Sequence, residues 1–218
     1  MITLSEENYL KAIYHLERQM GGAVSTNAIA DKMETKASSV TDMVKKLADK
    51  DYIIYKKYQG VSLTAKGNKT AANVVRKHRL WEVFLVEKLN FSWDEVHDVA
   101  EQLEHIKSPK LINELDVFLE FPTHDPHGDP LPDKDGNISK LDKISLSKVA
   151  LNDLCTCVGV IDSSAEFLKY LDKHKIALGT QIEVIEKESF DESMTIVIHN
   201  SELNISKTVA NNIYVKTH

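Results

Sequence analysis

The sequence predicts a mainly α-helical protein with a smaller β-rich part: a winged helix-turn-helix, a helical dimerisation domain and a C-terminal SH3-like β-barrel. Three observations lead to this fold class. Apolar residues recur at helical spacing through most of residues 5–119. Most of the prolines lie between residues 121 and 140. Short β-like runs follow from about residue 143. We therefore expect domains at residues 1–70, 71–140 and 141–218.

The first 70 residues carry the pattern of a winged helix. Helices are expected over residues 5–18, 26–33 and 37–50, with Ser5 as the N-cap of the first and Gly21-Gly22 at its end. A tight turn joins the second helix to the third, as in a helix-turn-helix. The β-like runs at residues 52–55 and 61–64 predict a hairpin after the third helix, which is the place of a wing.

Charge and side-chain size indicate that this part binds DNA. Residues 1–70 hold 11 Lys and Arg against 8 Asp and Glu, whereas the rest of the chain holds 16 against 25. Basic side chains neutralise phosphates, and small polar side chains at the start of a recognition helix approach base edges. An ordinary helical corner and a solvated hairpin are the simpler alternatives. The candidate DNA-binding residues are Lys36, Ser38, Ser39, Thr41, Asp42, Lys45, Lys46, Lys56, Lys57 and Tyr58.

The helical middle part carries the pattern of a metal site. Helices are expected over residues 64–89, with Thr64 as a cap, then over 93–106 and 110–119. On a helix over 93–106, His97, Glu101, Glu104 and His105 share a face. A divalent cation relieves the repulsion between such carboxylates. The alternative is a solvated acidic face with incidental histidines. Apolar helices beside a winged helix are also typical of a dimerisation unit.

The last third predicts a small β domain. Strands are expected over residues 153–160, 180–186, 194–198, 205–210 and 213–215, and a single helix over 165–174. Cys155 and Cys157 point to one face of the first strand, where core packing is favoured over a role as metal ligands. No run is long enough to span a bilayer and the N-terminus has no signal-peptide pattern, so we expect a cytoplasmic protein without a membrane partner.

With these motifs in place, the chain resembles the diphtheria toxin repressor family of metal-dependent transcriptional regulators, which sense iron or manganese. The resemblance covers nearly the full length. Its most specific pieces are residues 76–80 around His78, residues 96–105, and the Pro-rich residues 121–128. It implies a homodimer that binds double-stranded operator DNA, a C-terminal SH3-like (FeoA-like) domain, no enzymatic activity and no small-molecule substrate.

The resemblance also implies two metal positions. The primary regulatory site would use Asn8, Glu101, Glu104 and His105. The second site has two competing versions, between which the sequence does not choose. One version uses His78, Glu82 and His97; the other, in the manganese-sensing branch, joins Glu82 to Asp125, His127 and Asp162.

Departures from the family pattern bear on the metal. Glu101 stands where the iron sensors place a sulfur ligand, and hard oxygen ligands suit manganese. Asn8 is a neutral amide where the manganese sensors have an acid. Lys11 replaces a further manganese-coordinating acid, which argues against a closely spaced binuclear site.

The sequence thus predicts a Mn(II)-dependent repressor of metal-uptake genes, with a Fe(II)-dependent repressor of iron-uptake genes as the alternative. Co(II), Ni(II), Zn(II) or Cd(II) are possible substitutes for the physiological metal. A metal-independent DNA-binding module and a metallohydrolase remain as rival readings of the same residues.

Overall fold

The computed structural model describes residues 2–56, 59–139 and 142–217. The chain divides into two compact units. The first consists of Met1–Trp81, Ala100–Glu114 and Leu131–Ile138, and the second of Glu82–Val99, Leu115–Pro130 and Ser139–His218. The wing residues Lys57 and Tyr58, two of the expected DNA contacts, lie outside the described residues.

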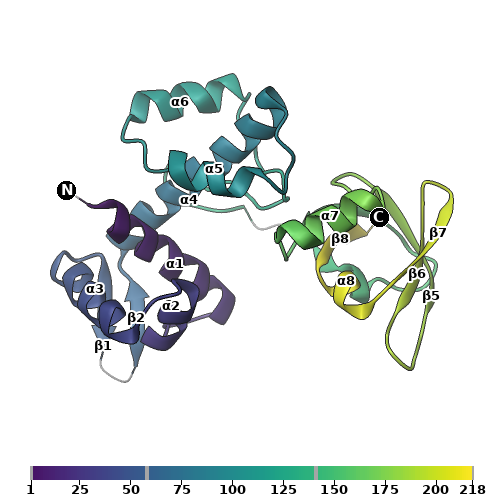
Figure 1. Cartoon of the computed structure of the whole chain (residues 1–218), viewed down its shortest axis with the longest axis horizontal. Coiled ribbons are helices and arrows are strands. Elements are labelled where there is room, and N and C mark those ends of the chain that lie inside the picture. Colours follow the sequence, from purple (N-terminus) through teal and green to yellow (C-terminus); the bar gives the residue numbers. More distant parts are fainter. Residues whose placement is uncertain (1, 57–58, 140–141, 218) are drawn as a thin grey trace. The chain divides into compact units, whose positions relative to one another are not determined.

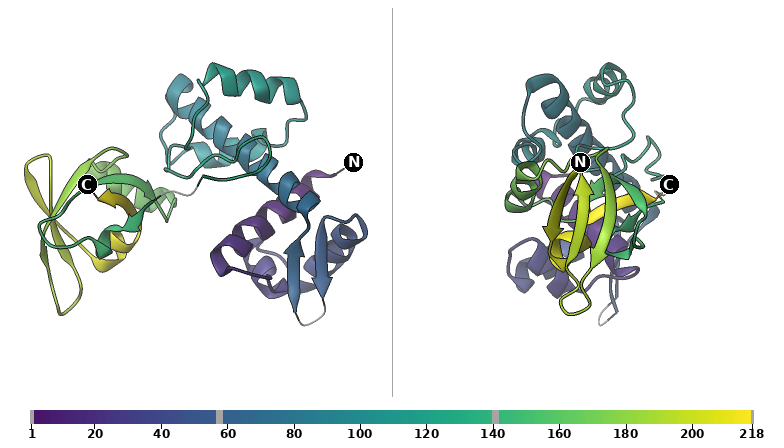
Figure 2. Two further views of the ribbon diagram at one scale, coloured as in Figure 1. Left: turned by 180° about the vertical axis from the view of Figure 1, so that it is seen from behind. Right: turned by 90° about the vertical axis from the view of Figure 1, so that its right-hand side faces the viewer.

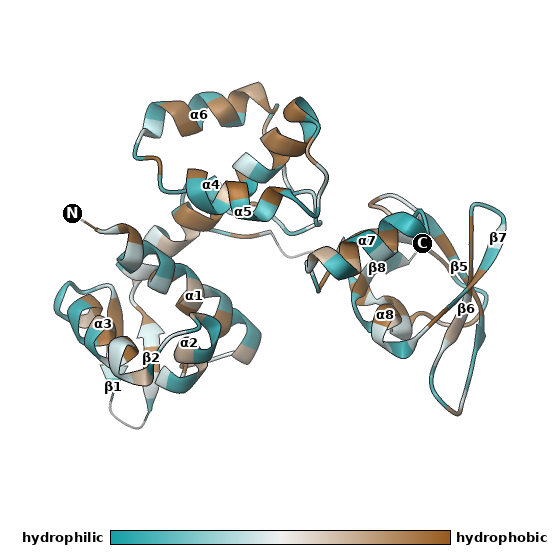
Figure 3. Cartoon of the chain, in the orientation of Figure 1, coloured by the Kyte–Doolittle hydropathy of each residue, from teal (hydrophilic) through white to brown (hydrophobic). Residues whose placement is uncertain are grey.

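The first unit contains the expected winged helix-turn-helix (Figure 1). Its elements are α1 (Leu4–Met20), α2 (Thr26–Lys32), α3 (Ala37–Asp49), β1 (Ile53–Lys56) and β2 (Gly60–Leu63). The two strands pair antiparallel, from Ile53 opposite Leu63 to Lys56 opposite Gly60. Apolar and polar residues alternate along α1 and α3 (Figure 3), and the apolar faces share one core that includes Ile13 and Leu47.

The first helix begins earlier than expected. Thr3, not Ser5, is the N-cap of α1, and its side chain accepts a hydrogen bond from the backbone N–H of Glu6. The Glu6 carboxylate accepts one in return from the backbone N–H of Thr3, which completes a capping box. The prediction of Ser5 was wrong because a reciprocal pair satisfies two helix-end donors, whereas a single cap satisfies one.

Three further helices follow: α4 (Ala65–Leu89), α5 (Val96–Leu103) and α6 (Pro109–Phe118). Thr64 caps α4 as expected, since its hydroxyl accepts a hydrogen bond from the backbone N–H of Gly67. The helix expected over 93–106 is shorter, because α5 ends at Leu103. Glu104 and His105 therefore lie in the turn after α5 and not on the helix that was expected to carry all four candidate ligands.

The second unit holds a six-stranded antiparallel sheet of the expected SH3-like kind (Figures 1 and 2). The strands are ordered β3-β8-β4-β5-β6-β7. Their bounds, with those of the helices between them, are β3 (Ile144–Ser145), the short 3-10 helix η1 (Leu146–Lys148), β4 (Leu154–Val160), α7 (Ala165–Lys173), β5 (Gln181–Lys187), β6 (Met194–Ile198), β7 (Ser201–Ile205), α8 (Lys207–Asn211) and β8 (Ile213–Thr217).

Residues 205–210 are not the strand that was expected. Strand β7 ends at Ile205, and α8 begins at Lys207 after the N-cap Ser206, whose hydroxyl accepts a hydrogen bond from the backbone N–H of Val209. The expectation of a single helix in this part was therefore also wrong. Cys155 and Cys157 are buried in the core of the sheet, and neither forms a disulfide.

The Pro-rich segment is held against the β domain within the second unit. Gly128 has a φ of 83°, and a Cβ at this position would lie 2.1 Å from the carbonyl oxygen of Val158. Only glycine fits such a backbone approach. The carbonyl of His127 accepts a hydrogen bond from the backbone N–H of Val160. Among the described residues, no helix has the length and apolarity needed to cross a membrane.

Candidate metal centre

Residues of α1 and of the turn after α5 form a cluster of metal-ligand side chains in the first unit. It is called the primary cluster. Nδ1 of His105 lies 2.7 Å from Oε2 of Glu7, and its Nε2 lies 3.6 Å from Oε1 of Glu104. Glu104 is fully buried and Glu7 is nearly so. A carboxylate that fixes one imidazole nitrogen leaves the other nitrogen oriented as a ligand, as is common in metal sites.

Among the residues that the structure describes, Oε1 of Glu104 is buried without a hydrogen-bond partner, and so is Oδ1 of Asn8, the residue that follows Glu7 on α1. Burying an acceptor without a partner is costly, and a buried carboxylate oxygen is especially so. A divalent cation would satisfy both atoms together with Nε2 of His105. The residues present therefore fit the metal that the sequence predicts.

Lys11 occupies the other side of the same cluster. Its Nζ lies 2.5 Å from Oε1 of Glu101, 2.6 Å from Oε2 of Glu104 and 3.3 Å from Nδ1 of His78. His78 itself contacts Oε2 of Glu104 at 2.6 Å. The Lys11 side chain is only 12% exposed, and its ammonium group takes the place of a cation among two carboxylates and an imidazole.

A second cluster lies entirely in the second unit. Ligand atoms of Glu82, Asp125 and His127 all lie within 4.8 Å of one another, and the three residues are buried. Burial lowers the pKa of His127, but the hydrogen bond and charge of Glu82 and the charge of Asp125 outweigh burial and raise the pKa to about 9. The two carboxylates therefore favour a cation at this position.

The remaining residues of the two versions of the second site lie as follows. His97 on α5 has its Nδ1 3.6 Å from Oε1 of Glu82, and its side chain is 55% exposed. Asp162 follows β4, and its Oδ1 accepts a hydrogen bond from the backbone N–H of Ser164. His78 lies in the primary cluster beside Glu104 and Lys11.

The ring of His127 is itself fixed by its neighbours. Nε2 of His127 contacts the backbone oxygen of Trp93 at 2.8 Å, and the two rings are stacked. The indole N–H of Trp93 donates to Asp172 of α7. The second cluster is therefore tied to the β domain through Trp93 as well as through the backbone of residue 127.

The candidate DNA-binding residues of α3 lie at its start and on its exposed side. Lys36 is the N-cap residue, and Ser38, Ser39 and Asp42 are exposed. The hydroxyl of Thr41 donates to the backbone oxygen of Ala37. Lys45 and Lys46 follow along α3, and Lys56 ends β1; all three are exposed.

Glu6 is a buried charge that was not expected from the sequence. Its Oε1 lies 2.7 Å from Nζ of Lys50 and 3.0 Å from Nζ of Lys46. Burial raises the pKa of Glu6, but the hydrogen bonds from Lys50, Thr3 and Lys46 outweigh burial and lower the pKa to about 2. The carboxylate is therefore ionised at neutral pH.

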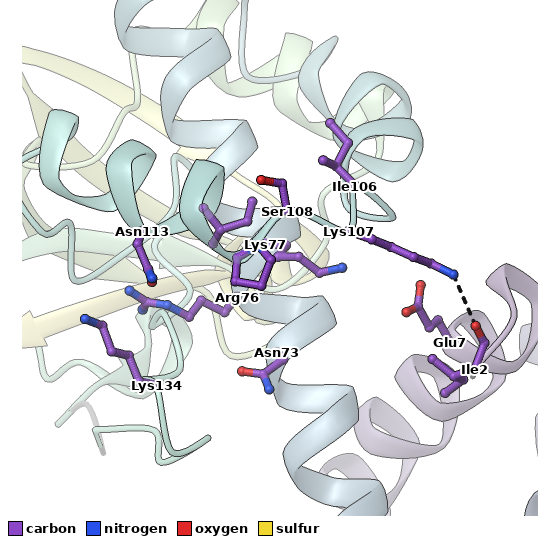
Figure 4. Close-up of a pocket in the computed structure, with 12 residues that line it drawn as sticks. Ile2, Glu7, Asn73, Arg76, Lys77, Ile106, Lys107, Ser108, Asn113 and Lys134 are labelled. Carbon is purple, nitrogen blue, oxygen red and sulfur yellow. Dashed lines mark hydrogen bonds between the residues drawn. The ribbon is translucent and has the colours of Figure 1, made fainter.

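A cavity of about 490 Å³ lies beside Glu7 in the first unit (Figure 4). Arg76, Lys134 and Asn113 lie toward one side of the close-up and Glu7 and Lys107 toward the other. The ammonium of Lys107 donates to the backbone oxygen of Ile2, which holds the start of the chain at the wall of this cavity.

Three known domain families match successive parts of the chain. Residues 1–61 match the N-terminal DNA-binding domain of iron-dependent repressors. Residues 64–133 match the metal-binding and dimerisation domain of the same proteins, and residues 144–217 match the FeoA domain. Solved structures agree over the whole chain. A manganese-dependent transcriptional repressor in complex with manganese is 31% identical with a TM-score of 0.87, and the match covers 98% of this chain and 100% of that one.

The chain belongs to the diphtheria toxin repressor family. Its members are metal-dependent transcriptional repressors, and the function expected from the sequence is confirmed at that level. The expected fold class is confirmed as well.

Both metal branches of the family are among the relatives. The regulator MntR of Bacillus subtilis is 35% identical over 121 residues, which are 56% of this chain and 84% of that protein. The iron-dependent repressor IdeR of Mycobacterium leprae is 35% identical over 127 residues, which are 58% of this chain and 54% of that protein. A structure of ScaR with bound Zn²⁺ is 30% identical, has a TM-score of 0.79, and covers 98% of this chain and 99% of its own.

The sequence indicated no function for Glu6 or Glu7, and it marked Lys11 only as a departure from the family pattern. Glu7 precedes Asn8 directly, and neighbouring residues of a helix do not share a face, so periodicity gave no signal for it. Glu6 lies in the first turn of α1, where acidic residues are common, so its position carried no functional signal. Lys11 was noted as a departure from the family, but its contacts with Glu101 and Glu104 come from segments 90 residues and more away in sequence.

Proposed function

We propose that this chain is a Mn(II)-responsive repressor that binds operator DNA as a homodimer and controls metal-uptake genes. The observation that supports it most directly is that Asn8 Oδ1 and Glu104 Oε1 are buried without a hydrogen-bond partner among the described residues, while Nε2 of His105 lies 3.6 Å from Glu104 Oε1. Two oxygen ligands and one nitrogen ligand suit manganese better than a softer ion. A cytoplasmic location and the absence of enzymatic activity go with this proposal.

The primary site would be held by Asn8, Glu104 and His105, with Glu101 close by and Lys11 beside it. The bound ion supplies positive charge that satisfies buried oxygen ligands from two segments of the chain. Asn8 lies on α1, within the DNA-binding domain, whereas Glu104 and His105 follow α5 of the dimerisation domain. An ion held by these side chains would fix α1 to the turn after α5. DNA affinity rises only if this arrangement binds DNA better than the metal-free one does.

The primary site would hold one ion, not two. Lys11 Nζ is within 2.6 Å of both Glu101 Oε1 and Glu104 Oε2, so a second divalent ion would meet a fixed positive charge there. His78 would orient Glu104 and Lys11 and would not serve as a ligand of this ion.

For the second site we favour the version with Glu82, Asp125 and His127. Its support is the close approach of three buried ligand atoms within one unit. Asp162 would join them, while His97 would remain a partner of Glu82 at the exposed edge. Through the contacts of residues 127 and 128 with β4, this site would steady the β domain.

The dimer and the DNA interface have separate support. Val117 and Phe118 of α6 and the following Phe121 are each more than half exposed, which is unusual for apolar side chains of this size. They would be covered by a second copy. In that dimer the exposed residues at the start of α3 would face the major groove, with Lys45 and Lys56 near the phosphates.

The test is a DNA-binding titration under anaerobic conditions. A duplex selected in vitro by the Mn(II)-loaded protein is titrated with the protein plus Mn(II), Fe(II), Co(II) or Zn(II), and with the protein plus chelator. Tight binding with Mn(II) at the lowest free-metal concentration supports the proposal. Preference for Fe(II) would assign the chain to iron uptake, and DNA binding that ignores chelator would remove the metal switch.

A further inference from the structure

The buried carboxylate of Glu6 belongs to neither metal cluster, yet it has four contacts. Oε1 contacts Nζ of Lys50 at 2.7 Å and Nζ of Lys46 at 3.0 Å. Oε2 contacts Nζ of Lys50 at 3.0 Å and the backbone N–H of Thr3 at 3.0 Å. The side chain has no exposed surface. A buried charge with this many partners holds its surroundings in one geometry, because breaking any contact leaves charge unpaired.

The partners of Glu6 lie at the C-terminal end of α3, the recognition helix of the helix-turn-helix. Lys46 is in the last turn of α3 and Lys50 is its C-cap. Glu6 is followed by Glu7, which contacts His105, and then by Asn8, whose side-chain oxygen is buried and has no hydrogen-bond partner among the described residues. One turn of α1 therefore contacts the metal centre on one side and the end of α3 on the other.

The apolar contacts between α1 and α3 are less directional than the ion pairs of Glu6. Leu10 and Ile13 of α1 and Val44 and Leu47 of α3 share one core. Apolar attraction is non-directional, so such a contact tolerates small rotations and shifts of a helix about its axis. Charge-assisted hydrogen bonds are directional.

We propose that Glu6 is a positioning residue that transmits metal binding to the recognition helix. Its ion pairs with Lys46 and Lys50 make α3 follow α1 when Asn8 and His105 take up their metal-bound positions. The inference rests on the proposed function, since it needs a metal ion at Asn8, Glu104 and His105. It also implies that Lys46, although exposed, has its charge shared with Glu6 and contributes less to phosphate binding than Lys45 does.

The experiment measures the coupling between metal and DNA in full-length dimers of wild type, Glu6→Gln and Asp49→Asn. Coupling is the ratio of DNA dissociation constants without and with Mn(II), measured by fluorescence anisotropy on the selected duplex. Mn(II) affinity is measured separately by calorimetry without DNA. Asp49→Asn is the matched control, because it removes an exposed carboxylate from the same turn of α3.

Glu6→Gln is expected to lower the coupling ratio roughly tenfold, a typical size for coupling between two sites. Its Mn(II) affinity without DNA should stay within about twofold of wild type, and Asp49→Asn should match wild type in both measurements. A wild-type coupling ratio in Glu6→Gln would overturn the inference, because core packing would then suffice. An equal loss of Mn(II) affinity and coupling would also overturn it, because Glu6 would then act on the site itself.

A second variant keeps the test decisive if Glu6→Gln does not fold. Lys50→Met removes the partner from the partly exposed C-cap of α3 and leaves Glu6 with Lys46. It should also lower the coupling ratio, and combining it with Glu6→Gln should add little if the two residues act as one pair. Full additivity of the two effects would contradict the proposal. If the wild-type protein shows no metal dependence at all, the proposed function itself fails, which separates the two outcomes.

Discussion

Replacing Lys11 by Glu should turn the one-ion primary site into a two-ion site. The substitution exchanges an ammonium group for a carboxylate beside Glu101, Glu104 and His78, so the net charge of this side of the cluster falls by two. Three carboxylates and an imidazole then surround the position that Nζ holds at 2.5, 2.6 and 3.3 Å from its partners. Oxygen and imidazole ligands in that number suffice for a divalent ion.

The metal-free variant should be markedly less stable. Glu104 is fully buried, and removing one partner of a buried ion pair costs about 3–5 kcal/mol. For a chain of this size that cost lowers the melting temperature by roughly 6–20 °C. Because bound ions stabilise the state that binds them, Mn(II) should recover most of this loss.

Isothermal titration calorimetry and elemental analysis count the ions. Both are done in a His127→Ala background, which removes the second cluster from the count. We expect one Mn(II) per protomer with Lys11 and two with Glu at this position. Lys11→Met, which removes the charge without adding a ligand, should lose stability but still bind one. Two ions bound to the protein that retains Lys11, or one ion bound to Lys11→Glu, would refute the reasoning.

Three further predictions concern Glu104 and Glu7 of the primary cluster and the two cysteines of the β domain. Glu104→Gln should abolish Mn(II)-induced DNA binding in a gel shift while size-exclusion chromatography still shows a dimer; an unaffected gel shift would contradict the site assignment. Glu7→Gln should weaken Mn(II) binding roughly 10- to 100-fold in calorimetry, because His105 loses the carboxylate that orients it, and an unchanged affinity would show that Glu7 does not orient it. Burial raises the pKa of both Cys155 and Cys157 to about 11, so at pH 8 these thiols should react with a thiol reagent only after unfolding; rapid reaction of the folded protein would place them outside the core.

The winged helix was predictable because its signals are local. Apolar spacing, small turn residues and alternating hairpin residues each act within a few positions of the chain, so α2, α3, β1 and β2 lie close to where they were expected. The errors came where two local signals compete. At the start of α1 both Thr3 and Ser5 offer a cap, and the reciprocal bond from Glu6 decides for Thr3.

The wrong prediction of a strand over residues 205–210 has a similar cause. Ile205 and Val209 are β-branched and flank polar residues, which favours a strand. Ser206 is a helix N-cap signal that competes with it, and the chain follows Ser206 into α8 because Ala210 is then buried in the core. Burial against distant residues is information that a short window of sequence does not contain.

For the candidate metal centre, the sequence indicated the residue types but not their contacts with distant residues. Glu104 and His105 were recognised from their spacing, although they lie beyond the end of α5. Their contacts with Lys11 and Glu7 join positions more than 90 residues apart, which no local periodicity encodes. Residue chemistry thus indicated which groups could bind a cation, and only the tertiary structure places the Lys11 ammonium among them.

The ammonium of Lys11 also bears on how the protein would respond to scarce metal. A sensor that needs two adjacent ions per subunit responds to the square of the free-ion concentration, which makes a steep threshold. In this protein the Lys11 ammonium takes the place of one of the two ions, and it is always present. A subunit would then become competent on capturing a single ion at this cluster, so gene expression would follow the intracellular metal supply in a graded way.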